Sequence, residues 1–269
     1  MNNQPSINKK NIKLASLVMI LVLIACSFGQ GPTQSLASTK TSVPPSGTPI
    51  PTATLTPTAT FYPTITPDLA ATQESQNDQA TIQSYVDSGY LSSTNGKFYS
   101  LDTSTFEMAQ INYLNFQDSG ALEPVTDFAF WGDLNWSSAG PVSSPEFSGC
   151  GIAFRLGENG DAYTAMLTND SVLVTWCFEA LGHRCGRVGK TRGKGTVKFG
   201  NPAKAHFEFI THKGHAYALV DGKFTAEYTL FQDRLTKPGI FAYSIISGTN
   251  RDYGTRCTVD NAKLWLPND

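Results

Sequence analysis

The sequence predicts an all-β fold, an antiparallel two-sheet jelly-roll sandwich, over residues 89–269. Short apolar runs alternate there with tight turns at regular spacing, as in sandwiches and barrels. Strands do not alternate with helices, which disfavours a parallel sheet. Only 16% of the 269 residues are charged, and 23 Gly and 15 Pro are present, which excludes a coiled coil or a Glu- and Lys-rich helical bundle.

The expected strands combine aromatic and β-branched residues and have ordinary strand lengths. They cover residues 128–131, 134–136, 150–155, 162–167, 171–176, 206–210, 216–220, 224–230, 241–246 and 263–266. Turn sequences separate several of them, at Asn159-Gly160-Asp161, Asn169-Asp170, Lys213-Gly214 and Asp221-Gly222. Such short turns favour hairpins, so we expect neighbouring strands to pair antiparallel.

The N-terminus has the pattern of an export signal. Three lysines precede a mostly apolar run from Leu14 to Ala25, which is short for a membrane span. The run ends in Leu23-Ile24-Ala25-Cys26, which resembles the lipobox of bacterial lipoproteins. That resemblance implies cleavage before Cys26 and acylation of its thiol. We expect residues 1–25 to be removed and the exported chain to be lipid-anchored on the extracytoplasmic side of a bacterial membrane. A plain secretory signal or an anchor helix is the alternative.

Two further segments precede the sandwich. Between Pro32 and Pro67 the chain has 8 Pro, 11 Thr and 4 Ser, with Lys40 as its only charge. This composition cannot bury enough apolar surface to offset the ordering entropy, so residues 26–67 are expected to form a disordered stalk. The chain then has a stretch without Pro or Gly, from Asp68 to about Val86, that includes Ala80, Ile82 and Tyr85. We expect a connecting helix over residues 68–88, capped by Asp68.

A set of motifs in the sandwich region resembles a known fold family. They are Ser148-Gly149-Cys150-Gly151-Ile152-Ala153-Phe154-Arg155, Asp161-Ala162-Tyr163, Tyr217-Ala218-Leu219-Val220-Asp221-Gly222, Pro238-Gly239-Ile240 and Asn261-Ala262-Lys263-Leu264-Trp265. Their order resembles the concanavalin A-like lectin/glucanase sandwich in its laminin-G-like branch. The resemblance implies a carbohydrate-binding or partner-binding sandwich, but its motifs are structural and specify no ligand.

Cysteine usage fits an exported domain. Four cysteines remain besides Cys26, which suggests two disulfides with three possible connectivities. Cys177 and Cys185 are expected to close the excursion between two strands, and Cys150 and Cys257 to join an early strand to a late one. The alternative is a metal site built from all four cysteines, but their spacing does not match the paired cysteines of zinc ribbons.

The usual catalytic signatures are missing from the sequence. Glycosidases of this fold place acids in a Glu-x-Asp pattern on one strand, and this pattern does not occur here. Glu208 lacks a partner acid two residues away, and Glu158 and Asp161 flank a turn. The sequence also has no G-x-S-x-G, H-E-x-x-H or Walker loop. We therefore expect a non-enzymatic protein, with a hydrolase that uses an unrecognised carboxylate pair as a minor alternative.

Two histidines and two tyrosines are candidate ligand contacts. His212 and His215 flank the Lys213-Gly214 turn, so a two-residue hairpin would place them opposite each other. In a regular register Tyr217 and Tyr228 would share the face of His212, although one bulge would reverse this. We assign no metal and no cofactor. Two imidazoles can bind a metal, but a solvated hairpin end with two polar residues is the favoured interpretation.

Calcium is common in the family that the motifs resemble. Asn159, Asp161, Asn169 and Asp170 supply possible oxygen ligands, but turns favour the same residues for backbone reasons. No specific calcium motif is present.

Charge is unevenly distributed along the chain. Residues 68–181 contain 15 acidic and 2 basic residues, whereas residues 182–215 contain 8 basic residues and one acid. Arg187, Lys190 and Arg192 lie in this basic segment and are candidate contacts for an anionic cell-envelope polymer. The alternative is that acidic strands lie beside the segment and offset its charge. The net charge of −2 argues against nucleic-acid binding driven by overall charge.

These observations together predict a membrane-anchored lipoprotein that displays a non-catalytic binding domain. Carbohydrate is the expected ligand because the family resemblance implies it. The alternative is a structural or adhesive module that binds a protein partner.

Overall fold

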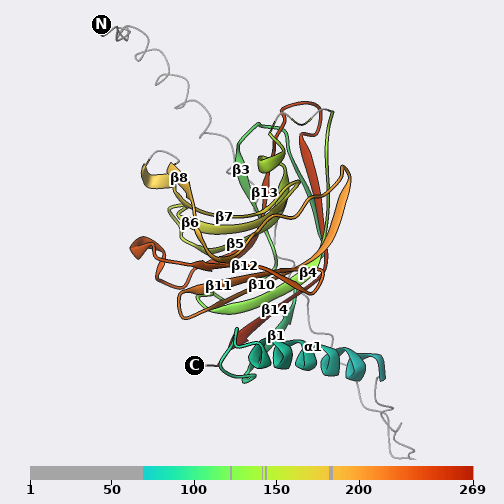
Figure 1. Cartoon of the computed structure of the whole chain (residues 1–269), viewed down its shortest axis with the longest axis vertical. Helices are drawn as coiled ribbons and strands as arrows, with labels where there is room; N and C mark the ends of the chain where they lie inside the picture. Colours follow the sequence, from blue (N-terminus) through green and yellow to red (C-terminus); the bar gives the residue numbers. More distant parts are fainter. Residues whose placement is uncertain (1–68, 122, 141, 143, 182–183, 269) are drawn as a thin grey trace, which may run out of the picture. The chain divides into compact units, whose positions relative to one another are not determined.

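The computed structural model describes residues 69–268, apart from residues 122, 141, 143, 182 and 183. It confirms the predicted fold class: two antiparallel sheets lie face to face, and one α-helix precedes them among the described residues (Figure 1). Cys26 and the Thr- and Pro-rich stretch lie outside the described residues. No helix in the described part of the chain is both long enough and apolar enough to cross a membrane.

The first sheet has eight strands. Its order is β1 (Gly96–Ser100), β14 (Thr255–Pro267), β4 (Phe128–Ser138), β10 (Ala203–His212), β11 (His215–Val220), β12 (Lys223–Thr229) and β9 (Lys190–Gly193), and β2 (Ser104–Met108) pairs with the other half of β14.

The second sheet has six strands. Its order is β3 (Leu114–Asp118), β13 (Ile240–Ile246), β5 (Gly149–Leu156), β6 (Ala162–Thr168), β7 (Val172–Phe178) and β8 (Arg184–Arg187). Short 3₁₀ turns lie at η1 (Pro145–Phe147), η2 (Glu179–Leu181) and η3 (Asp233–Leu235).

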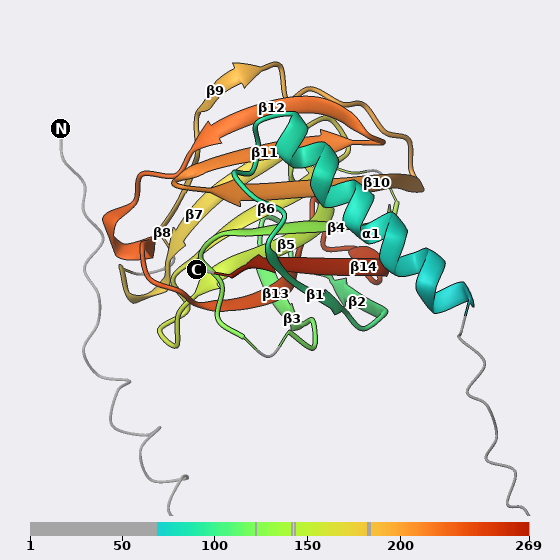
Figure 2. The ribbon, with the colours of Figure 1, turned by 90° about the horizontal axis from the view of Figure 1, so that it is seen from below.

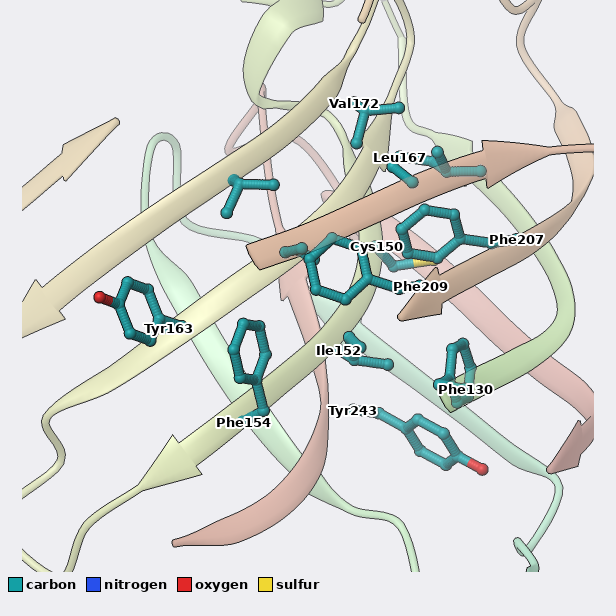
Figure 3. Close-up of a cluster of buried hydrophobic side chains, with 14 of the residues drawn as sticks. Phe130, Cys150, Ile152, Phe154, Tyr163, Leu167, Val172, Phe207, Phe209 and Tyr243 are labelled. Atoms are coloured by element: carbon teal, nitrogen blue, oxygen red, sulfur yellow. The ribbon is translucent and has the colours of Figure 1, made fainter. Parts of the chain in front are cut away.

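An aromatic core fills the space between the sheets (Figure 3). Phe207 and Phe209 of β10 point into it from the eight-stranded sheet, and Phe154 and Tyr163 meet them from the other. The Phe154 and Tyr163 rings stack with their centroids 5.4 Å apart, and all four side chains are fully buried. Because successive strand residues point to opposite faces, this inward set also determines which residues point outward.

The hairpin turns have the backbone that their sequences favour. Lys213 and Gly214 have φ values of 50° and 78°, and Asp221 and Gly222 have values of 51° and 74°. Positive φ at both central residues matches the type I′ turn, whose twist suits a two-residue hairpin.

A bulge in β12 changes the register that a regular hairpin would have. Leu219 pairs with Phe224, but Ala218 pairs with Ala226, so Thr225 is an extra residue. Tyr228 therefore pairs with Ala216 and points into the core, where it is 1% exposed. The expectation that Tyr228 shares the face of Tyr217 is wrong, because one extra residue sends every later side chain to the other face.

Both expected disulfides are present. Cys150 of β5 is bonded to Cys257 of β14, which links the two sheets through the core. Cys177 and Cys185 face each other across β7 and β8. The alternative of a four-cysteine metal site is therefore excluded.

The helix α1 (Leu69–Asp87) packs on the outer face of the eight-stranded sheet (Figure 2). Ile82 and Tyr85 are buried against Trp131 and Trp265 of that face. The Tyr85 hydroxyl donates a 2.7 Å hydrogen bond to Oε2 of Glu208 on β10. The expected helix is thus a third layer of the fold.

Arg155 at the end of β5 is a structural clamp. Its guanidinium donates hydrogen bonds to the carbonyl oxygens of Thr126 (3.2 Å) and Leu235 (3.0 Å), and lies 3.7 Å from Asp127. Burial lowers the pKa of Arg155, and the nearby Asp127 acts in the opposite direction. The arginine of the "G-x-x-F-R" motif therefore ties β5 to two loops.

We expect Arg155→Met to lower the free energy of unfolding by about 2–4 kcal/mol, because the buried Leu235 carbonyl loses its side-chain donor and the Thr126 carbonyl keeps only that of Thr211. Urea denaturation of the variant and the parent chain measures this. Lys237→Met is the control, because Lys237 is exposed and such a change should stay within about 0.5 kcal/mol. Equal effects of the two substitutions would contradict the clamp.

Candidate functional site

The six-stranded sheet curves around a cavity on the side away from the core. The cavity has a volume of about 330 Å³, and residues from β3 and from β7 and β8, at opposite ends of the strand order, line it together. The lining residues are Asn112, Tyr113, Leu114, Asn115, Phe116, Gly160, Cys177, Glu179 and Cys185.

One wall of the cavity is formed by β3 and the turn before it. Asn112 has a φ of 58°, and its backbone N–H donates to the Ser247 carbonyl at 2.7 Å, which holds the turn against the end of β13. Leu114 packs on the small apolar cluster of Met166, Leu173 and Ile246 on the outer face of this sheet. Tyr113, which is 40% exposed, therefore lies on a wall whose backbone is fixed at both ends.

The opposite wall is formed by the Cys177–Cys185 disulfide and the turn before β6. Asp161 is 5% exposed and accepts a 2.9 Å hydrogen bond from the backbone N–H of Glu179 and a 3.0 Å bond from the Asn159 side chain. Gly160 has a φ of 81°, and a Cβ there would lie 2.9 Å from the Glu179 side chain. Glycine is therefore the residue that suits this position. Its lack of a side chain lets the turn approach Glu179 closely.

These walls combine two kinds of chemistry. Tyr113 and Phe116 provide aromatic rings, whereas Asn112, Asn115 and Glu179 provide hydrogen-bond donors and acceptors. The described lining includes a single carboxylate. Among the described residues no three His, Cys, Asp or Glu side chains converge as a metal site. Asn159 and Asp161, which were considered as calcium ligands, bond to each other within the turn.

The predicted histidine pair lies on the other sheet. His212 and His215 face each other directly across the β10–β11 hairpin, as the two-residue turn predicts. Nδ1 of His212 lies 3.6 Å from Asp127, and Nδ1 of His215 lies 3.3 Å from Glu227. Each imidazole thus has its own carboxylate.

Tyr217 belongs to a row of parallel rings beside this pair. Its ring stacks on Tyr90 at 4.6 Å and lies 6.5 Å from the ring of His215. The Phe224 ring is also nearly parallel to that of Tyr90, with the centroids 6.2 Å apart. Tyr228, in contrast, donates its hydroxyl hydrogen bond to the Val172 carbonyl inside the core.

The three basic candidates are divided between the sheets. Arg192 on β9 lies 3.0 Å from Glu227 and places its guanidinium over the Phe224 ring. Lys190 donates to the Lys194 carbonyl at 2.6 Å. Arg187 lies on β8 in the six-stranded sheet, over the ring of Phe147 at 5.2 Å.

The structure therefore brings together His215, Tyr217 and Arg192 around Glu227. Arg187 and Tyr228 are not part of this group. The cavity residues Asn112 to Phe116 were not among the predicted contacts. The alternation of Leu114 and Phe116 with polar residues was the available signal, but five residues of this kind are weak evidence for a strand.

Comparisons with known proteins give remote matches only. No family model and no curated protein matches the sequence. Similar solved structures include the carbohydrate-binding module CBM66 from Bacillus subtilis, with 11% identity and a TM-score of 0.40 over 62% of this chain and 94% of that one. They also include a galectin from Caenorhabditis elegans, with 13% identity and a TM-score of 0.34 over 63% of this chain and 95% of that one.

A β-fructofuranosidase from Aspergillus kawachii is a further match, with 11% identity and a TM-score of 0.40. The match covers 63% of this chain but only 27% of the enzyme. The strand order and register define the fold. The laminin-G-like branch stays a prediction.

The two disulfides are expected to stabilise the domain unequally. Replacing Cys177 and Cys185 together by Ala should lower the free energy of unfolding by about 2–3 kcal/mol, because the closed loop is short. Replacing Cys150 and Cys257 together should cost about 4–5 kcal/mol, because their separation is 107 residues. Urea denaturation under non-reducing conditions measures both values. A larger loss for the Cys177 and Cys185 pair would contradict this order.

Proposed function

We propose that the sandwich is a non-catalytic carbohydrate-binding domain that holds a glycan in the cavity between β3 and the Cys177–Cys185 wall. The supporting observation is the joint presence of Tyr113, Phe116, Asn115 and Glu179 around one cavity of about 330 Å³. Small-molecule sites usually have this form, with apolar and aromatic walls and a few placed polar groups.

Saccharides suit this combination for a physical reason. One face of a sugar ring presents C–H groups that pack on an aromatic ring, and its hydroxyl groups need donors and acceptors at the edge. Phe116 and Tyr113 supply the first kind of contact, and the Asn112 amide and the Glu179 carboxylate supply the second. The disulfide and the Asp161 hydrogen bonds hold the opposite wall in place, so little ordering entropy is lost on binding.

The single carboxylate in the described lining favours binding over cleavage. Glycoside hydrolysis generally needs two carboxylates about 5–10 Å apart, one on each side of the scissile bond. Glu179 is the one acid in the described lining. The neighbouring Asp161 is buried, and its two oxygens accept hydrogen bonds from the Glu179 backbone N–H and the Asn159 side chain. A hydrolase with a different carboxylate pair is the less favoured alternative.

We further propose that the chain is an exported lipoprotein, anchored through Cys26, which displays this domain at the cell envelope. The support is the lipobox-like Leu23-Ile24-Ala25-Cys26 and the two disulfides, which persist in oxidising compartments. The segment of residues 26–67 would then separate the domain from the membrane.

Glycan binding is tested with the full chain against neutral and anionic polysaccharides at two salt concentrations. We expect salt-insensitive binding to a neutral glycan, and Phe116→Ala should weaken it about tenfold through lost stacking. Phe231→Ala is the matched control, because Phe231 is 60% exposed and outside the cavity lining.

Unchanged affinity in Phe116→Ala, with measurable binding in the parent, would contradict the proposed site. Binding to anionic polymers alone, with strong salt dependence, would instead point to the segment that contains Arg187, Lys190 and Arg192. Absence of binding to any glycan would favour the adhesive module with a protein partner.

Lipid anchoring is tested by metabolic labelling with a fatty acid in a bacterial host. We expect label in the parent chain and none in Cys26→Ser, because acylation requires the thiol. Equal label in both chains would refute the anchor at Cys26.

A further inference from the structure

A second hollow lies on the opposite side of the sandwich, between α1 and the β10–β12 hairpins. It has a volume of about 550 Å³. Aromatic rings of Tyr90, Trp131 and Phe224 line it together with Glu208 and His206 and with hydroxyl groups of α1. We call it the helix crevice. The helix crevice and the proposed glycan cavity have no lining residue in common.

Glu208 is the unusual member of this crevice. It is 7% exposed, and its cross-strand neighbours are Trp131 on β4 and Leu219 on β11. Its one hydrogen bond among the described residues comes from the Tyr85 hydroxyl. A buried carboxylate with a single neutral donor is poorly compensated, because desolvation of a charge is costly without a cation.

Three basic side chains of this face have other acids as partners. Lys263 pairs with Glu74 and Asp78 of α1. Arg192 pairs with Glu227, and His206 lies 2.9 Å from Asp133.

The Asp133 carboxylate that faces His206 is itself well compensated. Burial acts to raise the pKa of Asp133, but hydrogen bonds from Asn261 and His206 outweigh it and keep the pKa below its usual range. None of the ion pairs between described residues includes Glu208. The crevice thus presents a negative charge that its own side chains leave without a cation.

The aromatic walls favour a cation at the same place. Aromatic ring faces attract ammonium and guanidinium groups, especially where water is partly excluded. The Phe224 ring already contacts one cation in this way, because the Arg192 guanidinium lies 4.8 Å from its centroid. Trp131, which is 7% exposed, stands beside Glu208 in the adjacent strand. A carboxylate flanked by rings is suited to an organic ammonium ion.

We propose that the helix crevice binds an organic ammonium group, with Glu208 as its counter-ion and Phe224, Tyr90 and Trp131 as its aromatic walls. The site lies on the other sheet from the glycan cavity. Either proposal can therefore fail without affecting the other.

Calorimetric titration of the full chain with four small probes tests this proposal. Glucosamine, choline and Nα-acetyllysine amide carry an ammonium group, and N-acetylglucosamine is the neutral counterpart of the first. We expect at least one ammonium probe to bind at millimolar concentration or below, and N-acetylglucosamine to bind at least tenfold more weakly than glucosamine. The preferred probe identifies the source as an amino sugar, a lipid headgroup or a lysine side chain.

Glu208→Gln is the decisive variant. Its amide oxygen can still accept the Tyr85 hydrogen bond, but its charge is lost, so we expect at least tenfold weaker binding of the preferred probe. Glu107→Gln makes the same change at an exposed residue that pairs with Arg256, and should bind as the parent does. Phe224→Leu provides a second variant on an exposed wall residue and should weaken binding about two- to fivefold.

Three results would overturn the proposal. One is the absence of binding by all three ammonium probes at millimolar concentration. Another is equal, measurable binding of glucosamine and N-acetylglucosamine by the Phe116→Ala chain, whose glycan cavity is impaired, because hydroxyl groups rather than charge would then be recognised at the crevice. The third is unchanged affinity in a folded Glu208→Gln chain. If circular dichroism shows that this variant is unfolded, unchanged affinity in Phe224→Leu has the same consequence.

Discussion

The aromatic core between the two sheets is the constraint on which the rest of the structure depends. Phe207 and Phe209 must point inward to meet Phe154 and Tyr163. Their neighbours His206 and Glu208 must then point outward, because side chains alternate along a strand. An acid in the middle of an apolar sheet face is a consequence of this alternation, and the helix is the element that makes it tolerable.

The helix α1 covers a face that could not remain open to water. Trp131 and Trp265 make the outer side of the eight-stranded sheet apolar, and Ile82 of α1 is fully buried against it. Tyr85 adds a hydroxyl that reaches Glu208, and burial together with that neighbouring charge raises the pKa of Tyr85 far above its usual value. Tyr85 therefore stays protonated and remains a donor. The six-stranded sheet has no such helix on it among the described residues, and its curvature forms a cavity instead.

The sequence is informative where local periodicity decides the structure. Long apolar strands and the Lys213-Gly214 turn follow from residue type and spacing alone, and so does the opposition of His212 and His215. The short strands β1, β2 and β3 were not predicted, because they are half-exposed and pair only with distant partners. The extra residue Thr225 has no signal of its own, yet it decides the direction of Tyr228. The cavity depends on sheet curvature, which brings β3 near η2 across the whole strand order.

The distribution of charge illustrates the same difference between pattern and geometry. The basic segment spans the open edge of the sandwich, because β8 pairs with β7 in one sheet and β9 pairs with β12 in the other. Its cations therefore reach partners on both sheets. Arg192 meets Glu227, an acid from beyond the acidic half of the sequence, whereas Arg187 meets the ring of Phe147. The charge of the basic segment is therefore neutralised only in part, and only where the neighbouring strand carries an acid. By the same reasoning Glu208, the one acid of the basic segment, lies between the cross-strand neighbours Trp131 and Leu219. Its nearness along the chain to basic residues gives it no ion pair among the described residues.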